Sequence, residues 1–411
     1  MKKIFFVTYG GGHINIIKLI AKELIENYNV SIRILALTTA YEAARKEFSE
    51  DIVKKISDYK FLFEKDVEII ERKGLEFLPE NYSVGGLVTE EETKNYIGLS
   101  FLDLISKYGE EKANKLYKNK KRQAFLPTTI IKEILKFENV DIVVSTTSPR
   151  FEQASLIAGK ELNIKTLQVL DLFSDVFPLP EADHIVVMND YVKKGLENKE
   201  LKNKTYHVLG QPAIEETVLK VLKINKKELA KEKKIDLTKK TLLFATQKLS
   251  RVDEDYKISE SIPYEVVYDE LFEILNRIHK TFNVNVFIRI HPNENYKDYS
   301  KYFDKYDFLK FTNSILSLEE SIALSDFVLV KTSTVAIESK ASGKVVFTYK
   351  HDSEKFYSVP VFTKEPFIFS PNLSELEKNI AAYLKNESDN RKDDFLVFNS
   401  KKGIANLLMN L

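Results

Sequence analysis

The sequence predicts two α/β domains, each a doubly wound parallel sheet with helices on its faces. Short apolar runs alternate with amphipathic stretches along most of the chain, the pattern of strands joined by crossover helices. Polar motifs stand where such a run gives way to a helix, at Gly10–His13, His291–Pro292 and Thr332–Thr334. Open parallel sheets bind ligands at these strand ends. With 411 residues, 44% of them hydrophobic, the chain can fill two cores of ordinary size.

Composition excludes several classes of protein. Lys and Arg total 62 against 61 Asp and Glu, so the net charge of +1 gives no reason to expect a nucleic-acid partner. The chain has no cysteine, which excludes disulfides, thiolate nucleophiles and cysteine-based metal sites. The apolar run Ile4–Tyr9 is too short for a signal peptide, and no run of about 18 apolar residues follows elsewhere. We therefore expect a cytoplasmic protein.

The first half of the chain supplies one predicted sheet. Its strand-like runs are residues 2–9, 30–37, 140–144, 166–170 and 184–188. Residues 40–136 are largely helical and charged, which indicates an elaborated connection rather than a separate domain. The breaker Gly210–Pro212 marks the boundary, so we predict an N-terminal domain over 1–212 and a C-terminal domain over 213–411. The last helix could return to the first domain.

The second half supplies the other predicted sheet. Its five strand-like runs are residues 241–246, 284–290, 308–311, 327–330 and 345–349. They alternate with helical segments such as 262–281, and no tandem repeat relates the two halves. The alternation again favours parallel strands with crossover helices.

The glycine loop after the first strand has a candidate catalytic residue at its end. Gly11 and Gly12 would let the backbone approach an acceptor closely, and the helix that follows exposes its first amides. The spacing is not G-x-G-x-x-G and no acidic residue ends the second strand, which argues against a dinucleotide site. His13 begins the helix and could take a proton from a sugar hydroxyl. The alternative is a polar residue that faces solvent or simply satisfies a hydrogen bond.

Two more strand ends carry polar candidates. Arg150 and Glu152 follow the run at 140–144 and are candidate acceptor-binding residues, although Ser148–Pro149 is also an ordinary helix start. Asp171 follows the run at 166–170 and could assist the base or cap the loop. Elsewhere, the basic segment Lys112–Arg122 could lie on an anionic membrane surface or form a solvated helix face.

The C-terminal half carries a candidate donor site. His291 comes directly after its strand and can hydrogen-bond a phosphate oxygen, while Pro292 fixes the exiting backbone. Thr332, Ser333 and Thr334 present hydroxyls and amides at a helix start, a favourable place for an anion. Glu338 could accept from ribose hydroxyls or be a surface glutamate. The pattern Asp253–Asp255 spells D-x-D in a charged loop, and we expect neither a metal nor another cofactor.

These motifs together resemble the GT-B glycosyltransferases, whose two Rossmann-like domains face one another across a cleft. The C-terminal half resembles the sialyltransferase-like enzymes of bacterial capsule and surface polysaccharides. That resemblance implies that His291, Ser333 and Thr334 bind the phosphate of a CMP-sialic-acid donor without a metal. Gly10–His13 is similar to the glycine-rich loop of UDP-sugar transferases, in which the histidine is a proposed base. The acidic motif of bacterial polysialyltransferases is missing, so the base would be His13 or Asp171.

The resulting hypothesis is an inverting, metal-independent glycosyltransferase that moves a sugar from a CMP or UDP donor to a glycan or lipid-linked hydroxyl, with possible contact at the inner membrane. One alternative is a UDP-N-acetylglucosamine 2-epimerase, which has the same fold and a His-x-Asn like His291–Asn293. The other sequence motifs of that epimerase family are missing from this chain, and Thr246–Gln247 and Thr332–Val335 stand at their positions. Further alternatives are a CDP-glycerol glycerophosphotransferase and a non-catalytic sugar-nucleotide-binding protein, and His13 argues against the last.

Overall fold

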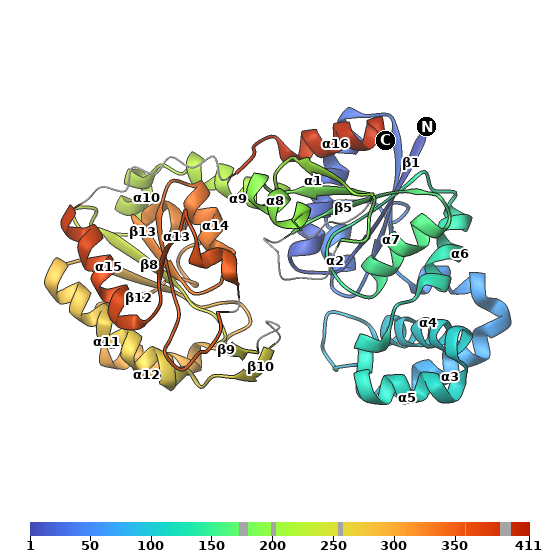
Figure 1. The fold of residues 1–411 in the computed structure, drawn as a ribbon, viewed down its shortest axis with the longest axis horizontal. Coiled ribbons are helices and arrows are strands. Elements are labelled where there is room, and N and C mark those ends of the chain that lie inside the picture. The colour runs from blue at the N-terminus through green and yellow to red at the C-terminus, as the bar shows by residue number, and fades with distance from the viewer. Residues whose placement is uncertain (172–179, 199–202, 254–257, 358, 387–395) are drawn as a thin grey trace. The chain divides into compact units, whose positions relative to one another are not determined.

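The chain forms two compact units in the computed structural model, which describes residues 1–411 except 172–179, 199–202, 254–257, 358 and 387–395 (Figure 1). Unit 1 consists of Met1–Ala213 together with Val397–Leu411, and unit 2 of Ile214–Leu396. The C-terminal segment therefore groups with the first unit. Each unit is a parallel sheet covered by helices, which confirms the predicted fold class of two α/β domains.

Unit 1 contains a seven-stranded sheet in the order β3-β2-β1-β4-β5-β6-β7, and every strand pair in it is parallel. The strands are β1 Lys2–Thr8, β2 Val30–Ala36, β3 Val53–Lys54, β4 Ile142–Ser145, β5 Lys165–Val169, β6 His184–Val187 and β7 Thr205–Val208. The chain winds away from β1 through β2 in one direction and resumes at β4 in the other. The loops after β1 and β4 therefore meet at a topological switch point, where doubly wound sheets bind ligands.

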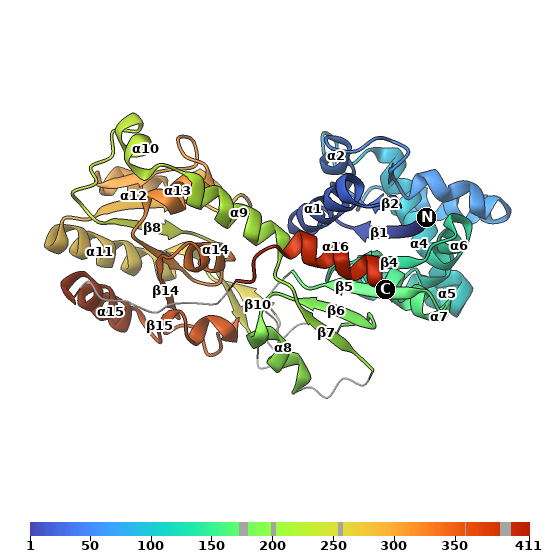
Figure 2. The same cartoon turned by 90° about the horizontal axis from the view of Figure 1, so that it is seen from above.

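Helices cover the faces of the unit 1 sheet. They are α1 Gly12–Asn27, α2 Ala40–Arg45, α6 Thr128–Glu138, α7 Phe151–Glu161, α8 Asp190–Glu197 and α16 Ser400–Asn410. The apolar stripe of α1 is buried, in keeping with the helical periodicity of the sequence. Beside it packs α16 (Figure 2), and the ammonium of Lys2 donates to the carbonyls of Leu408 and Met409 at 3.1 and 2.8 Å. These contacts bind the C-terminal helix to the start of the chain.

The long connection between β3 and α6 is helical, as the sequence predicts. It consists of η1 Ser57–Asp66, α3 Val67–Phe77, α4 Glu90–Tyr108, α5 Glu110–Lys120 and η2 Lys121–Ala124. Tyr117 and Phe125, within and just after the basic segment, are buried and stack at 5.4 Å between ring centroids. Since these rings pack inward, they offer no apolar face to a membrane. Among the described residues, no helix is both long and apolar enough to cross a bilayer.

Unit 2 contains a six-stranded parallel sheet in the order β12-β11-β8-β13-β14-β15. The strands are β8 Thr241–Ala245, β11 Asn285–Arg289, β12 Leu309–Phe311, β13 Phe327–Val330, β14 Val345–Tyr349 and β15 Ile368–Ser370. The sequence predicts five of these; β15 is only three residues long and gives too short an apolar run. An antiparallel pair, β9 Ser250–Val252 and β10 Ile258–Ser261, follows β8. The switch point of this sheet lies between β8 and β13.

The helices of unit 2 are α9 Pro212–Lys223, α10 Lys226–Glu232, α11 Tyr264–Phe282, η3 Tyr296–Asp298, α12 Ser300–Lys305, α13 Leu318–Leu324, α14 Val335–Ala341, η4 Pro360–Thr363 and α15 Leu373–Asn386. The first of them, α9, begins at the boundary and carries the chain into the unit. Figure 2 shows α11 and α15 running beside one another, and Arg277 of α11 holds Glu377 of α15 with two hydrogen bonds of 2.8 and 2.7 Å.

Candidate functional site

The glycine loop of unit 1 is shaped by a close approach of two strand-end loops. A Cβ on Gly10 would lie 1.8 Å from the hydroxyl oxygen of Thr39, in the loop after β2, so a larger residue cannot stand there without a shift. Gly11 has φ of 71°, in the left-handed region that favours glycine. Gly12 begins α1, and a Cβ there would meet nothing within 4 Å. Gly11 is therefore favoured by its backbone conformation, and Gly10 by the close approach of the Thr39 side chain.

His13 is held by one ring nitrogen. Its Nδ1 lies 2.6 Å from the Thr146 hydroxyl oxygen, and that hydroxyl donates its only proton to Glu152 Oε2 at 2.6 Å. The Thr146 oxygen must then accept from His13, which places a proton on Nδ1. The other nitrogen, Nε2, is left with a free lone pair and can accept a proton. This arrangement has the chemistry of a general base.

Glu152 is fully buried behind this base. Besides the Thr146 hydroxyl, its carboxylate accepts from the backbone amides of Tyr9 at 2.9 Å and Ser148 at 3.0 Å. Burial raises its pKa, while the positive charge available on His13 and these donors oppose the rise. Glu152 thus ties the loops after β1 and β4 together. A direct contact with an acceptor stays a prediction.

Asp171 stands beside His13, so the structure brings the two candidate catalytic residues together. Its Oδ2 lies 3.5 Å from His13 Nδ1, and its Oδ1 accepts a hydrogen bond from the Thr147 hydroxyl. The side chains are 13% and 23% exposed, so a substrate could reach the histidine. A carboxylate at this distance stabilises the imidazolium that forms when His13 takes a proton.

Arg150 follows Thr146 and Thr147 and belongs to the same edge of the sheet. Its φ of 70° is unusual for a residue with a side chain. The guanidinium lies over the Tyr9 ring at 5.1 Å, and Nε donates to the Tyr9 hydroxyl at 3.4 Å. The Tyr9 hydroxyl in turn lies 2.8 Å from that of Tyr96 on α4, and burial raises the pKa of both phenols. The sequence contains no signal that would link α4 to this edge.

His291 occupies the corresponding kind of position in unit 2, directly after β11. Its Nδ1 accepts from the backbone amide of Asn293 at 3.1 Å, so the proton belongs on Nε2, which becomes a donor. The backbone amide of His291 donates to Glu294 at 3.2 Å, and Glu294 is anchored by the hydroxyls of Tyr264 and Tyr299 at 2.9 and 2.8 Å. The loop thus presents a fixed N–H group suited to an anionic oxygen.

Thr332 is locked to Gln247, which follows β8. The Thr332 amide donates to Gln247 Oε1 at 2.7 Å, and Gln247 Nε2 donates back to the Thr332 hydroxyl. Ser333 Oγ accepts from the Val335 amide at 3.3 Å, while Thr334 is exposed. Because α14 has only seven residues, the hydroxyls rather than a long helix dipole are what this loop offers an anion. Sequence reasoning did not identify Gln247 as a site residue.

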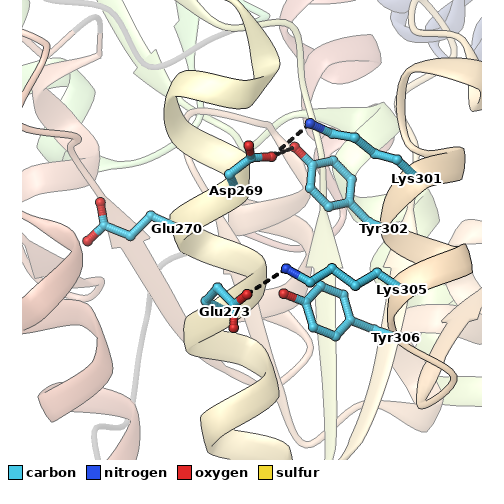
Figure 3. Close-up of a pocket in the computed structure, with 7 residues that line it drawn as sticks. All are labelled: Asp269, Glu270, Glu273, Lys301, Tyr302, Lys305 and Tyr306. Carbon is cyan, nitrogen blue, oxygen red and sulfur yellow. Dashed lines mark hydrogen bonds and ion pairs between the residues drawn. The ribbon is translucent and has the colours of Figure 1, made fainter.

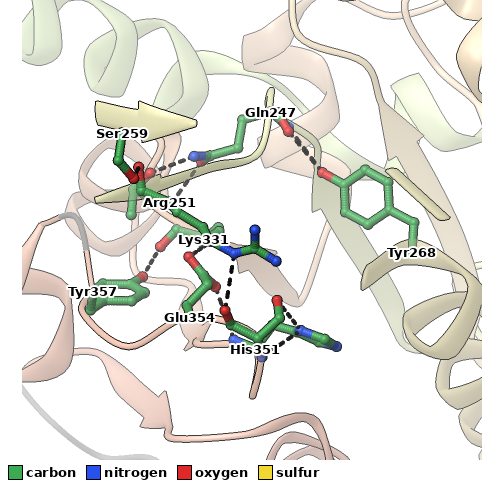
Figure 4. A network of polar contacts seen from close by, with 10 residues as sticks. Gln247, Arg251, Ser259, Tyr268, Lys331, His351, Glu354 and Tyr357 are labelled. Carbon is green, nitrogen blue, oxygen red and sulfur yellow. Dashed lines mark hydrogen bonds and ion pairs between the residues drawn. The ribbon is translucent and has the colours of Figure 1, made fainter. Parts of the chain in front are cut away.

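A buried ion pair lies next to Thr332 in the chain, in the loop after β13 (Figure 4). Lys331 and Glu354 are 2% and 1% exposed and contact one another directly. Glu354 also accepts from the His351 amide at 3.0 Å, and the Tyr357 hydroxyl donates to the Lys331 carbonyl. Lys331 and Glu354 come from the loops after β13 and β14, so no local sequence pattern joins them.

Glu338 lies within α14 and is 9% exposed. Burial raises its pKa to about 7, while a hydrogen bond from Thr217 of α9 opposes the rise. Its Oε2 has no hydrogen-bond partner among the described residues. The structure thus places this carboxyl against protein, and a contact with ribose stays a prediction.

A separate groove of about 410 Å³ lies between α11 and α12 (Figure 3). Lys301 donates to Asp269 at 2.8 Å and Lys305 to Glu273 at 2.7 Å, so its cations are already neutralised. The groove therefore offers little to an anionic nucleotide. Among the described residues, no three His, Asp or Glu side chains gather as a metal site would require. Glu254 and Asp255 of the D-x-D pattern lie outside the described residues.

Comparison with known proteins identifies the fold but no family. No protein-family model and no curated protein matches the chain. Among solved structures, it is similar to UDP-GlcNAc 2-epimerases from Methanocaldococcus jannaschii (TM-score 0.60, 15% identity) and, bound to UDP-GlcNAc, from Neisseria meningitidis (0.63, 14%), both covering 100% of each chain. A glycosyltransferase from Rickettsia africae matches at 0.53 and 13% over 100% of this chain and 93% of its own. These likenesses show a GT-B-like fold; they do not extend to sialyltransferase-like capsule enzymes.

Proposed function

We propose that the protein is an enzyme acting on a UDP-sugar, and that it transfers the sugar to an acceptor hydroxyl with inversion at the anomeric carbon. The observation that carries this proposal is the state of His13. Thr146 and Glu152 hold its proton on Nδ1 and leave Nε2 free to accept one, beside the carboxylate of Asp171. One positioned base is what an inverting transfer requires.

In this proposal, unit 2 holds the donor. The Nε2–H of His291 and the hydroxyls of Ser333 and Thr334 would donate hydrogen bonds to the diphosphate, whose negative charge grows as the bond to the sugar breaks. The UDP-GlcNAc bound in the Neisseria meningitidis structure of the same fold favours UDP over CMP. A CMP-sialic-acid donor has no such support.

The chemical step follows from these roles. The acceptor hydroxyl gives its proton to His13 Nε2 while its oxygen forms a bond to the anomeric carbon. The bond between that carbon and the UDP oxygen breaks, and UDP leaves with the electron pair. Asp171 stabilises the imidazolium. We propose a cell-surface glycan or lipid-linked sugar as acceptor, and a cytoplasmic location in which the enzyme meets it at the inner membrane.

The second candidate is 2-epimerisation of a UDP-sugar, which the names of the similar solved structures favour. Both reactions break the bond between sugar and UDP with the help of a base. They differ in the need for an acceptor, since an epimerase converts UDP-N-acetylglucosamine alone and exchanges the hydrogen at C2 with solvent.

Turnover in D₂O separates these activities. UDP-N-acetylglucosamine, UDP-glucose, UDP-galactose, CDP-glycerol and CMP-sialic acid would each be incubated with and without a panel of neutral and acidic p-nitrophenyl glycosides, and products followed by proton and phosphorus NMR. Transfer predicts UDP and an inverted glycoside only when an acceptor is present. Deuterium at C2 without acceptor would instead indicate the epimerase, a phosphate-containing product the glycerophosphotransferase, and nucleotide binding without any product a non-catalytic protein.

A further inference from the structure

Another cavity lies in unit 1, lined in part by Thr38, whose neighbour Thr39 packs against Gly10 in the loop that carries His13. Its volume is about 110 Å³, and its lining comes from the loop after β2, from α4, and from the segments following α3 and α5. The lining residues are Thr38, Asn81, Val88, Glu92, Thr93, Tyr96 and Arg122. The helical connection therefore forms this cavity at the carboxyl edge of the sheet, because Thr38 lies two residues after the end of β2.

Two guanidinium groups converge on the aromatic wall of this cavity. Arg122 lies over the Tyr96 ring at 5.9 Å. Arg150 stands outside the lining residues and donates to the Tyr9 hydroxyl, which pairs with the Tyr96 hydroxyl. Within the described residues, neither arginine forms an ion pair with a carboxylate. Glu152 attracts Arg150 and Glu80 attracts Arg122 only from beyond ion-pair distance. A guanidinium without a carboxylate in direct contact is suited to an anionic ligand, and its fork matches a carboxylate or a phosphate.

The donors of these arginines are only partly used. Arg122 donates through Nε and Nη2 to Asn81, at 2.5 and 2.7 Å, so Nη1 remains for a ligand. Arg150 donates through Nε to the Tyr9 hydroxyl at 3.4 Å and also hydrogen-bonds the Tyr96 hydroxyl, which leaves further N–H groups of its guanidinium for a ligand. Asn81 thus fixes one guanidinium in place at the cavity wall before any ligand arrives, which lowers the entropy cost of binding.

The remaining polar groups of the cavity suit hydroxyls. Glu92 accepts from the backbone amides of Ile56 and Ser57 at 3.1 and 3.4 Å, which partly compensates its charge, and burial raises its pKa. Thr38 and Thr93 add two hydroxyl groups to the wall. A ligand with both an anionic group and hydroxyls would use both kinds of contact.

We propose that this cavity with Arg150, which we call the arginine pocket, binds a sugar that carries a carboxylate or a phosphate, and that this acidic sugar is part of the acceptor. Its role as acceptor rests on the proposed function, because the pocket lies beside the loop of the base. Its preference for an acidic sugar rests on the two arginines alone.

Binding of matched small sugars to the full chain tests the pocket. Glucuronate, glucose 6-phosphate and glucose would be titrated by ligand-observed NMR or calorimetry, with UDP titrated in parallel. We expect at least one acidic sugar to bind about tenfold or more tightly than glucose, as a charged hydrogen bond provides. The favoured acid then tells whether the natural group is a carboxylate or a phosphate.

Substitutions of the two arginines test whether the preference for an acidic sugar comes from the arginine pocket. Arg122→Gln and Arg150→Gln should each remove most of the preference for the acidic sugar, Arg122→Lys should keep part of it, and UDP affinity should stay unchanged in all three. Lys121→Gln is the matched control, because Lys121 is exposed and pairs with Glu80 outside the pocket lining. Melting curves report whether Arg122→Gln still folds, and Arg150→Gln tests the pocket without touching the Asn81 contact.

Equal binding of glucose and both acids, or an unchanged preference in both glutamine variants, would overturn the arginine pocket. Failure of UDP to bind the wild-type protein would contradict the proposed function instead, and would leave the sugar titrations readable. The two proposals can thus fail separately.

Discussion

His13 and Glu152 share one hydroxyl group: the Thr146 oxygen lies 2.6 Å from His13 Nδ1 and 2.6 Å from Glu152 Oε2. The carboxylate is fully buried, whereas the imidazole is partly exposed. Thr146 therefore links the His13 ring, which a substrate can reach, to the fixed carboxylate of Glu152, and this contact orients the ring. Thr146 and Glu152 thus act as positioning residues for His13, and a direct contact of Glu152 with an acceptor stays a prediction.

Removing the Thr146 hydroxyl should leave the His13 ring less firmly oriented. In Thr146→Val, His13 Nδ1 loses its hydrogen bond to the hydroxyl and keeps only Asp171 Oδ2 at 3.5 Å, so the ring is less firmly oriented and we expect kcat to fall about 10- to 100-fold with little change in KM. Thr146→Ser keeps the hydroxyl and should retain most of the activity. Nitrogen-15 NMR of the imidazole should show a mixture of tautomers in the valine variant and Nδ1–H in the serine variant. A valine variant with wild-type kcat would contradict the role of Thr146.

His291 is predicted to bind the diphosphate through Nε2–H. His291→Ala should weaken UDP binding by about tenfold or more, because a hydrogen bond to a charged group is lost. His279→Ala serves as the control, since His279 stacks on Phe308 and contacts the Val284 carbonyl within unit 2. Calorimetric titration with UDP compares the two variants with the wild type. Equal UDP affinity in His291→Ala and the wild type would remove His291 from the donor site.

Removing one partner of the Lys331–Glu354 pair should destabilise the fold strongly, whereas replacing both partners with apolar residues should destabilise it less. Lys331→Met leaves the Glu354 carboxylate buried without its partner, and we expect a loss of about 3–5 kcal/mol in the free energy of unfolding. The double variant with Glu354→Leu should recover much of that loss. It should stay about 1–3 kcal/mol less stable than the wild type, because the buried His351 amide loses its acceptor.

Denaturant unfolding measures each variant of this pair. Lys378→Met, which breaks the exposed pair of Lys378 with Glu375, should have little effect. If the double variant is no more stable than Lys331→Met alone, the two residues do not act as a pair.

Glu338 should make the stability of unit 2 depend on pH. Its pKa is about 7 in the folded chain, against an ordinary value of 4.5, so the folded state holds this proton more tightly than the unfolded state. The free energy of unfolding that this bound proton adds is fully present below about pH 4.5 and is lost as the pH rises through about 7. Relative to Glu338→Gln, the wild type should therefore lose up to about 3 kcal/mol between pH 5 and pH 8. Parallel stability curves for the two proteins would show that the carboxyl does not titrate in this range.

The parts of this protein that sequence patterns could predict are those set by local periodicity. The long apolar strands such as β1 and β11, and the polar residues directly after them, stand where the alternation of apolar and polar residues places them. His13 and Asp171 were expected at one sheet edge because parallel strands end on the same side. The short strands β3 and β15 escaped prediction because two or three residues carry no periodic signal.

Contacts between distant segments could not be read from the sequence. Gln247 faces Thr332 and Tyr96 faces Tyr9 only after the chain has folded, across 85 and 87 positions. The place of Glu152 after β4 does not reveal that tertiary packing buries its side chain completely. Burial of this kind depends on how helices cover the sheet edge, which no single segment specifies.

The most direct test of the account is turnover of a UDP-sugar by the wild type, His13→Gln and the control His279→Gln, measured as UDP release with a panel of p-nitrophenyl glycosides as acceptors. We predict acceptor-dependent UDP release in the wild type and in His279→Gln, and a loss of about 100-fold or more in His13→Gln while UDP affinity is kept. Wild-type turnover in His13→Gln would contradict the account, because the base it is built on would then be unnecessary.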